Sequence, residues 1–442
     1  MAAGGTWQSQ NKVRPGAYIN FVGTPKALSS VGERGIVAAP LSLSWGDQII
    51  EMTAQELVTG ASLEKAGVLF TDDAALNLRL LLQSCSKAVI YRLNAATATK
   101  ATKTVAGLKV TAKYGGTFGN KIKFTVEVNS GQIIVKTFAN GMLKDTQRVA
   151  NVAVLAENDF VTFEAATGEL ENITTQTALE NGADGEEVTD ISAALDALES
   201  YQFNILAITQ TGNTTKDQAV QWVESLRNDK GVKVQIVLSE YNGDSEAVIS
   251  TWQGYKLEDG TDVSKAQAVL AVASLEAGAT LTQSMTGAVI PGAIAINDAP
   301  KTNDEIIEAL NAGKLILSRR GDGAVLIEKD QNTLHTFTPE KSYIFSKNRP
   351  LRVMDQVGND TKTLFNTSYL GKVSNNEEGR NIFKNDLVAY FKTLEAMGAI
   401  QNFSVDDVQV LPGNDSDGVV VNLWIQPVDS MEKLYMTVNV VG

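Results

Sequence analysis

The sequence predicts an α/β fold: a discontinuous α/β core with an inserted all-β module (sandwich or barrel), then an α+β C-terminal domain, with an extended strand in each terminal arm. Strands that alternate with helices of ten or more residues after about residue 183 indicate an α/β layer of mostly parallel strands. Short strands with turns between them over 96–182 indicate the all-β module. A long helix followed by three strands indicates the C-terminal domain.

The α/β core is expected to comprise residues 31–95 and 183–335. In the first part, RGIVAAP and KAVIYRL predict strands, and TDDAALNLRLLLQSC predicts a helix with Thr71 as its N-cap. In the second part, FNILAIT and VKVQIVL predict strands, and KDQAVQWVESLRND and VSKAQAVLAVASLEAG predict helices. The apolar run of KAVIYRL is typical of a strand covered on both faces, so we expect it in the same sheet as the later strands.

The all-β module is expected at 96–182, as an insertion into the α/β core. The stretch NAATATKATKT at 94–104 is low in complexity and is interpreted as a linker that leads into it. Asn140-Gly141 lies between two alternating runs, and this dipeptide is the strongest short signal of a β-hairpin.

The C-terminal domain is expected at 336–430. TLHTF and KSYIFSKNRPLRVMDQV predict hairpin-like strands, residues 376–397 predict a long helix that ends at Gly398, and SVDDVQVL and GVVVNLWIQP predict strands. The apolar stripe of the helix consists of Ile382, Phe383, Leu387, Phe391 and Leu394.

Each end of the chain is predicted to be an arm with one strand, at 1–30 and 431–442. Both strands alternate with period two, as a strand with two different faces does. The N-terminal arm strand consists of Tyr18, Ile19, Asn20, Phe21 and Val22. The C-terminal arm strand includes Leu434, Tyr435, Met436, Thr437, Val438, Asn439 and Val440. Neither strand has an evident local partner, and an unpaired strand edge is an aggregation hazard, so each is expected to pair elsewhere.

The composition is that of an ordinary globular protein, with 43% hydrophobic and 20% charged residues. A formal net charge of −13 argues against direct binding of nucleic acid, because clusters of Lys and Arg bind the phosphates in such complexes. No apolar run approaches twenty residues, and the first residues lack the pattern of a secretory signal. Cys85, the single cysteine, lies in an apolar helical run and is expected to be a buried structural thiol.

The residues that carry chemistry do not form a recognisable catalytic, cofactor or metal site. His335 is the only histidine, and we interpret it as a non-catalytic strand residue. The glycine-rich stretch YGGTFGNK at 114–121 lacks the spacing of a phosphate loop and precedes a strand, so it is expected to form a turn. The acidic stretch NDSDG lacks the spacing of a calcium loop. A chain of this size without such a site is more typical of a structural or assembly protein.

Five stretches of the sequence together resemble the contractile tail sheath proteins of myophages, phage-like bacteriocins and related contractile injection systems, closest to the shorter sheaths of Gram-positive phages. They are KVRPGAYINF, AKYGGTFGNKIKF, NTLHTFTPEKSYIFSKNRPLRVMDQV, YLGKVSNNEEGRNIFKNDLVAYFKTLEAMGAIQNF and MEKLYMTVNV. The resemblance covers essentially the whole chain in the expected order.

The resemblance implies a structural subunit that polymerises as a helix of stacked rings around a tail tube and contracts to drive the tube through a target envelope. It implies that the all-β module lies outside, that the C-terminal domain faces the tube, and that both arms add as strands to neighbouring subunits. It implies as partners other copies of the chain, the tube protein, and baseplate and tail terminator proteins, with no nucleic acid, membrane insertion or cofactor. The particle would be a virion tail or a phage-tail-like particle assembled in the bacterial cytoplasm.

On the long helix, Arg380, Lys384 and Lys392 are candidates to face the tube, and a solvated helix face is an equally good interpretation. Two other classes remain open. An α/β enzyme with a β insertion would need a catalytic cluster that the sequence does not show. A surface-layer or adhesion protein would need a secretion signal.

Overall fold

The computed structural model describes residues 3–5, 16–18, 31–59, 64–69, 72–129, 131–186, 188–299 and 301–440. The chain divides into two compact units. The larger unit comprises 32–359 and 427–442, and the smaller comprises 1–31 and 360–426.

A six-stranded sheet forms the centre of the larger unit, in the order β15-β14-β13-β3-β5-β4. Its strands are β3 (Ile36–Leu41), β4 (Ile49–Thr53), β5 (Lys87–Arg92), β13 (Ile205–Ala207), β14 (Gln235–Ser239) and β15 (Val248–Thr251). All neighbours are parallel except β4, which is antiparallel at one edge. Because β3 pairs with both β5 and β13, the prediction that KAVIYRL joins the later strands in one sheet is confirmed.

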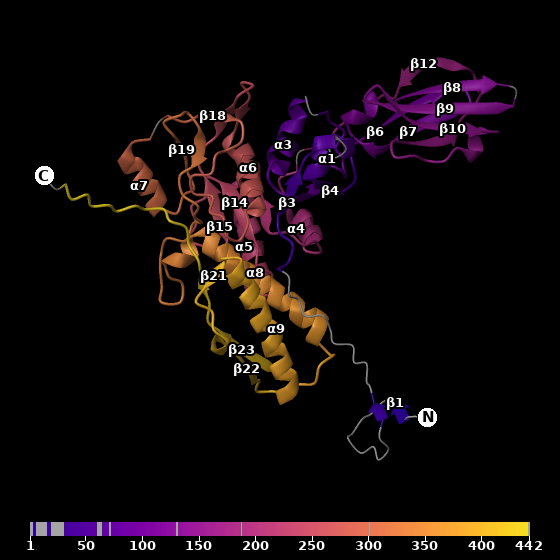
Figure 1. The fold of residues 1–442 in the computed structure, drawn as a ribbon. Coiled ribbons are helices and arrows are strands. Elements are labelled where there is room, and N and C mark those ends of the chain that lie inside the picture. Colours follow the sequence, from indigo (N-terminus) through magenta and orange to yellow (C-terminus); the bar gives the residue numbers. More distant parts are fainter. Residues whose placement is uncertain are drawn as a thin grey trace. The chain divides into compact units, whose positions relative to one another are not determined.

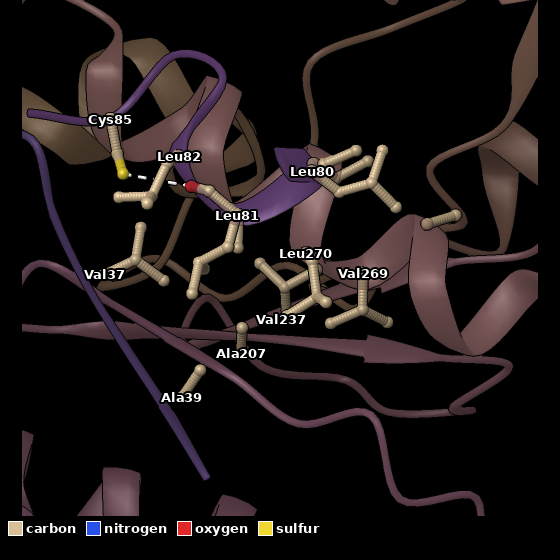
Figure 2. Packing of buried hydrophobic residues seen from close by; sticks show 14 of the residues in the cluster. Val37, Ala39, Leu80, Leu81, Leu82, Cys85, Ala207, Val237, Val269 and Leu270 are labelled. Atoms are coloured by element: carbon tan, nitrogen blue, oxygen red, sulfur yellow. Dashed lines mark hydrogen bonds between the residues drawn. The ribbon is translucent and has the colours of Figure 1, made fainter. Parts of the chain in front are cut away.

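Helices cover both faces of this sheet, and successive residues of a strand pack into different cores. Val37 and Ala39 pack beneath α3 (Leu76–Leu82) and α6 (Lys265–Gly278), as Figure 2 shows. Ala38 packs on the other face, against the core that includes α4 (Ser192–Leu198) and α5 (Asn213–Asn228). The strands are therefore buried on both sides, which explains their nearly continuous apolar runs.

Cys85 belongs to the first of these cores and is 2% exposed. Its Sγ lies 3.0 Å from the carbonyl oxygen of Leu81 (Figure 2). Burial raises the pKa of the thiol to about 11, and the expectation that Cys85 is a buried thiol is confirmed.

Between β5 and α4 the chain forms a β-sandwich of two antiparallel sheets around a shared apolar core. One sheet has the order β10-β9-β8-β12 and the other β11-β7-β6. The strands are β6 (Lys100–Val105), β7 (Leu108–Gly115), β8 (Lys123–Asn129), β9 (Gln132–Ala139), β10 (Met142–Val149), β11 (Val161–Ala165) and β12 (Ile173–Ala178). Of the two forms predicted for the insertion, a sandwich or a barrel, the structure has the sandwich.

The chain enters and leaves the sandwich through one neck. Thr99 and Ala183 exchange two backbone hydrogen bonds there, of 2.9 and 3.1 Å. Arg92, 1% exposed, joins the sandwich to the central sheet, because its guanidinium donates to the carbonyl oxygens of Gly46 (2.8 Å) and Gly115 (2.7 Å). These contacts tie the sandwich to the α/β core at several points.

The remaining elements of the larger unit flank the central layers. They are α1 (Ala54–Thr59), β16 (Tyr255–Leu257), β17 (Asp262–Val263), β18 (Ala293–Ile296), α7 (Asn303–Asn311), β19 (Leu317–Arg319) and β20 (Val325–Ile327). Helix α8 (Asn348–Leu364) begins in this unit and crosses into the smaller unit at Asp360.

In the smaller unit, α9 (Glu377–Ala396) packs against a hairpin of β22 (Val408–Pro412) and β23 (Val419–Leu423). Two short strands, β21 (Ile400–Gln401) before the hairpin and β24 (Gln426–Pro427) after it, pair with each other. Near the N-terminus, β1 (Ala3–Gly5) pairs in parallel with β2 (Gly16–Tyr18). Tyr390 donates to the buried carboxylate of Asp360 at 2.7 Å. The long helix predicted at 376–397 is confirmed by α9, and Gly398, with a φ of +76°, follows its end.

Four details of the sequence interpretation are wrong. The region KSYIFSKNRPLRVMDQV is not a pair of strands but a short 3-10 turn (Tyr343–Ser346) followed by α8. Buried Val353, Val357 and Leu364 recur at helical spacing. Pro350 lies in the first turn of the helix, where its missing N–H is tolerated. TLHTF is not a strand, so His335 is not a strand residue. The stretch 94–104, interpreted as a linker, contains most of β6, and its threonines are residues that favour strands. Ile382 is 44% exposed and lies off the buried stripe of α9.

The helix predicted from TDDAALNLRLLLQSC also begins later than expected. A 3-10 turn (Asp73–Ala75) precedes α3, and the proposed N-cap Thr71 lies outside the described residues. The domain limits drawn from the sequence stay a prediction.

Candidate assembly interface

The C-terminal segment of the chain is exposed on both of its faces. Residues 428–440 have no helix or strand, and Figure 1 shows them as a trace that extends away to the C-terminus. The exposed fractions of the large apolar side chains are 84% for Leu434, 88% for Tyr435, 73% for Met436, 67% for Val438 and 90% for Val440. Thr437 and Asn439, between them, are exposed as well. A β-like sequence is therefore presented to solvent, with no strand partner among the described residues. That it pairs with a neighbouring subunit stays a prediction.

The start of this segment is attached to the larger unit by one buried cation. Lys347 Nζ lies 2.7 Å from Asp429 Oδ2 and 2.8 Å from Glu432 Oε2, while the Lys347 side chain is only 5% exposed. Burial lowers the pKa of this ammonium, but the hydrogen bonds and charges of the two carboxylates outweigh it, so the pKa lies above its ordinary value. Thr286 Oγ1 donates to the other oxygen of Glu432 at 2.8 Å. We call Lys347, Thr286, Asp429 and Glu432 the C-terminal anchor.

In the smaller unit, the β22–β23 hairpin forms a sheet of only two strands within the described chain, so each strand has a neighbour on one side only. Alternation places Val408 and Val410 inward toward α9, opposite Leu423 and Val421. The outer face carries Leu411 (44% exposed) opposite Val420 (45%), and Trp424 (55%) lies just after the hairpin. An apolar face beside unpaired edges is suited to the addition of further strands.

The N-terminal arm can be followed only in part. Tyr18 is the last residue of β2, which pairs in parallel with β1. The other predicted arm residues, Ile19, Asn20, Phe21 and Val22, lie outside the described residues.

The three candidate tube-facing cations of α9 have different surroundings. Arg380 donates to the carbonyl oxygen and to Oδ1 of Asn375, at 3.3 and 2.9 Å, and Asn375 donates in turn to the carbonyls of Ser416 and Gly418 in the hairpin loop. Arg380 thus helps to hold the hairpin. Lys384 is half-buried and Lys392 is exposed. Contact of any of the three with a tube stays a prediction.

Three family models of phage tail sheath domains match successive parts of the chain. The phage tail sheath protein beta-sandwich domain matches 94–190, the central domain 184–333 and the phage tail sheath C-terminal domain 340–441. A solved structure, the sheath tail protein of Desulfitobacterium hafniense, is 37% identical with a TM-score of 0.80, and the match covers 95% of this chain and 99% of that one. The chain belongs to the phage tail sheath protein family.

Other relatives of this sheath protein agree. The sheath tail protein of Listeria innocua is 34% identical with a TM-score of 0.83, over 92% of this chain and 95% of that one. The phage-like element PBSX protein XkdK of Bacillus subtilis (strain 168) is 34% identical over 99% of both chains. The resemblance found in the sequence is confirmed: this is a structural subunit of a contractile tail sheath of a phage tail or phage-tail-like particle.

The residues that the sequence offered as candidates for catalysis or for metal or phosphate binding do not form a site in the described part of the sheath protein. His335 lies on an exposed loop, where Nδ1 is 2.9 Å from the carbonyl oxygen of Thr333 and 3.5 Å from Asp244 Oδ1. Among the described residues, no three His, Cys, Asp or Glu side chains come together to hold a metal ion. The stretch YGGTFGNK ends β7 and forms a 3-10 turn (Thr117–Lys121) before β8, as expected for a turn between strands. None of the described helices is long and apolar enough to cross a membrane.

Sequence reasoning missed the C-terminal anchor and the apolar outer face of the hairpin. The anchor joins residues more than eighty positions apart, and no local pattern marks Lys347 as buried. A signal of the outer face is present in the sequence, because Val420 and Trp424 share one face of the alternating stretch GVVVNLWIQP, opposite Val419, Val421 and Leu423.

Proposed function

We propose that this sheath protein polymerises as a helix around a tail tube by exchanging its terminal strands with neighbouring copies, and that the polymer contracts to drive the tube through a target cell envelope. The observation that carries the proposal is the C-terminal segment. Five large apolar side chains there are each at least 67% exposed, four of them at alternate positions (Leu434, Met436, Val438 and Val440), and no strand of the described chain pairs with the segment.

A receiving surface of the right kind is present in the same chain. The β22–β23 hairpin offers backbone groups at its edges and an apolar outer face. If a docked arm forms about five backbone hydrogen bonds at about 1 kcal/mol net each, it is held by about 5 kcal/mol before side-chain burial. An arm that docks on a different neighbour makes a heterologous contact, which builds rings or open helices.

The α/β core and the sandwich of the larger unit are suited to move as one rigid body. Arg92 bonds carbonyls of both the core and the sandwich, and the sheet is buried on both faces. Contraction would then repack whole bodies from a metastable extended helix into a wider, shorter one while the arms stay docked. The energy is stored at assembly, so the step needs no nucleotide. Expected partners are other copies, the tail tube, and baseplate and terminator proteins, with assembly in the bacterial cytoplasm.

Deletion of residues 433–442 tests the proposal, because it removes the exposed segment and leaves the C-terminal anchor intact. We expect a folded monomer that forms no sheaths by negative-stain electron microscopy. Met436→Pro should also block assembly, since proline cannot donate to a strand ladder, whereas Met436→Leu should assemble normally. Long sheaths formed by the deletion variant would refute strand exchange through this segment.

A further inference from the structure

Glu432 is the last residue of the C-terminal segment that is partly buried and bonded to the rest of the larger unit. The side chains of Lys347 and Glu432 are 5% and 12% exposed, whereas residues 433–440 are all exposed. The segment therefore has two parts, an attached base at 428–432 and an exposed tail at 433–440.

The base is attached through a charge that the body cannot satisfy by itself. Within the described chain, both ion pairs of Lys347 Nζ go to the base, to Asp429 and Glu432. A buried ammonium without a partner is strongly unfavourable, so the folded body favours the state in which the base is docked.

A second contact fixes the direction of the base. Thr286 Oγ1 donates to Glu432 Oε1 at 2.8 Å and accepts from the backbone N–H of Asp330 at 2.9 Å. Asp330 is 1% exposed and accepts from the backbone N–H of Met285 at 2.8 Å. The Glu432 carboxylate is thus held from two sides, by Lys347 and by a threonine that is itself fixed in the buried interior.

We infer that Lys347 is a positioning residue for assembly: through Asp429 and Glu432 it sets the point and direction from which the exposed tail reaches a neighbouring subunit. The inference rests on the proposed strand exchange. Eight residues beyond Glu432 span at most about 27 Å when extended, at about 3.4 Å per residue. A tail held at a fixed origin samples a small volume and meets its acceptor at a higher effective concentration than one that starts from a loose base.

A spin label on the base measures its attachment directly. Met431 is 103% exposed, so Met431→Cys removes no packing, and the native Cys85 is buried and does not compete for the label. In the labelled monomer we expect Lys347→Met to shorten the rotational correlation time of the nitroxide by about threefold or more. Lys230→Met, which breaks an exposed ion pair with Glu199, should leave it unchanged. Lys347→Arg should restore much of the parent line shape, since it keeps the charge.

Assembly gives the second readout. We expect Lys347→Met to raise the protein concentration needed for sheath formation by about tenfold while the folded monomer persists. If Lys347→Met does not fold, Asp429→Asn with Glu432→Gln replaces it. The amide oxygens can still accept from the buried ammonium, which keeps the body folded, but the loss of both negative charges weakens the attachment of the base, so changes in the same direction are expected. Unchanged label mobility, or an unchanged assembly threshold, in the folded variant overturns the inference. Sheaths formed after deletion of 433–442 would instead overturn strand exchange itself, so the two failures are distinguishable.

Discussion

The Arg227 guanidinium and the Asp355 carboxylate form two parallel hydrogen bonds, Nη1–Oδ2 of 2.7 Å and Nη2–Oδ1 of 2.8 Å, which join α5 to α8. Both side chains are nearly buried, and Arg227 Nη1 also donates to the carbonyl oxygen of Val234. Asp355→Ala would leave the guanidinium buried without its counter-ion, so we expect the free energy of unfolding to fall by about 3–5 kcal/mol in urea titrations. Glu199→Ala, which breaks an exposed pair with Lys230, should cost under about 1 kcal/mol; an equal loss in both would contradict the prediction.

Gly116 lies where the sandwich meets the core. Its φ is +133°, and a Cβ at this position would lie 1.9 Å from the carbonyl oxygen of Ser44. Gly116→Ala should therefore lower the free energy of unfolding by about 2–4 kcal/mol, through both backbone strain and the clash. Gly131→Ala is the matched control, because its φ is +84° with no atom within 4 Å, and strain alone should cost about 1–2 kcal/mol. Equal costs would show that the contact with Ser44 is not constraining.

Because the thiol of Cys85 is buried, we expect the free energy of unfolding to fall at alkaline pH. Burial raises its pKa from 9.0 to about 11, so the folded state holds the proton more tightly than the unfolded state. The resulting stabilisation is complete below pH 9 and is lost between about pH 9 and 11, up to about 3 kcal/mol. Cys85→Ala has no proton to lose, so the difference in unfolding free energy between the two proteins should shrink over this range. A constant difference from pH 8 to 11 would contradict the assignment.

Lys384 tests the tube-facing side of α9. If this face lies against the tube, Lys384→Glu should reduce co-assembly of sheath and tube in a pelleting assay without changing the melting temperature. Lys109→Glu reverses a charge on the sandwich, 2.9 Å from Glu164, and should not affect co-assembly. Normal co-assembly of the Lys384 variant would favour a solvated helix face.

The outer face of the hairpin tests the proposed acceptor. Val420 is 45% exposed, so Val420→Lys should change the monomer's stability by no more than about 0.5 kcal/mol. If neighbouring arms add next to this face, the buried charge should prevent sheath formation. Val154→Lys makes the same change at a 59% exposed site on the sandwich and should assemble normally. Sheaths formed by the Val420 variant would place the acceptor elsewhere.

Local patterns predicted much of the fold. Asn140 and Gly141 have φ of +51° and +76°, as a tight hairpin turn between β9 and β10 requires, and only a few residue types tolerate such angles. The continuous apolar run of KAVIYRL marked β5 as a doubly covered strand, which in turn revealed that the sandwich is an insertion.

The errors arose where tertiary contacts outweigh local sequence. In α8, buried polar residues such as Arg352 and Asp355 obscured the helical stripe, because they are satisfied by partners distant in sequence, Glu276 and Arg227. In 94–104, low complexity suggested a linker, but Thr102 pairs with β7 and with the backbone of Glu180. The C-terminal anchor could not be predicted for the same reason: an ion pair between residues 82 positions apart leaves no periodic pattern in the sequence.

The neck of the sandwich has an evolutionary consequence. Thr99 and Ala183 pair directly, so the chain enters and leaves the insertion at the same place. The strands before and after the insertion, β5 and β13, both pair with β3, so the central sheet is continuous without it. A replacement module would need to keep that paired entrance, the carbonyl at Gly115 that receives Arg92, the small residue at Gly116 and an apolar site for Trp45, which packs into the core of the sandwich. The strands beyond these contacts are then free to vary, so we expect recombination at this entrance to exchange the whole sandwich as a cassette while the α/β core stays the same.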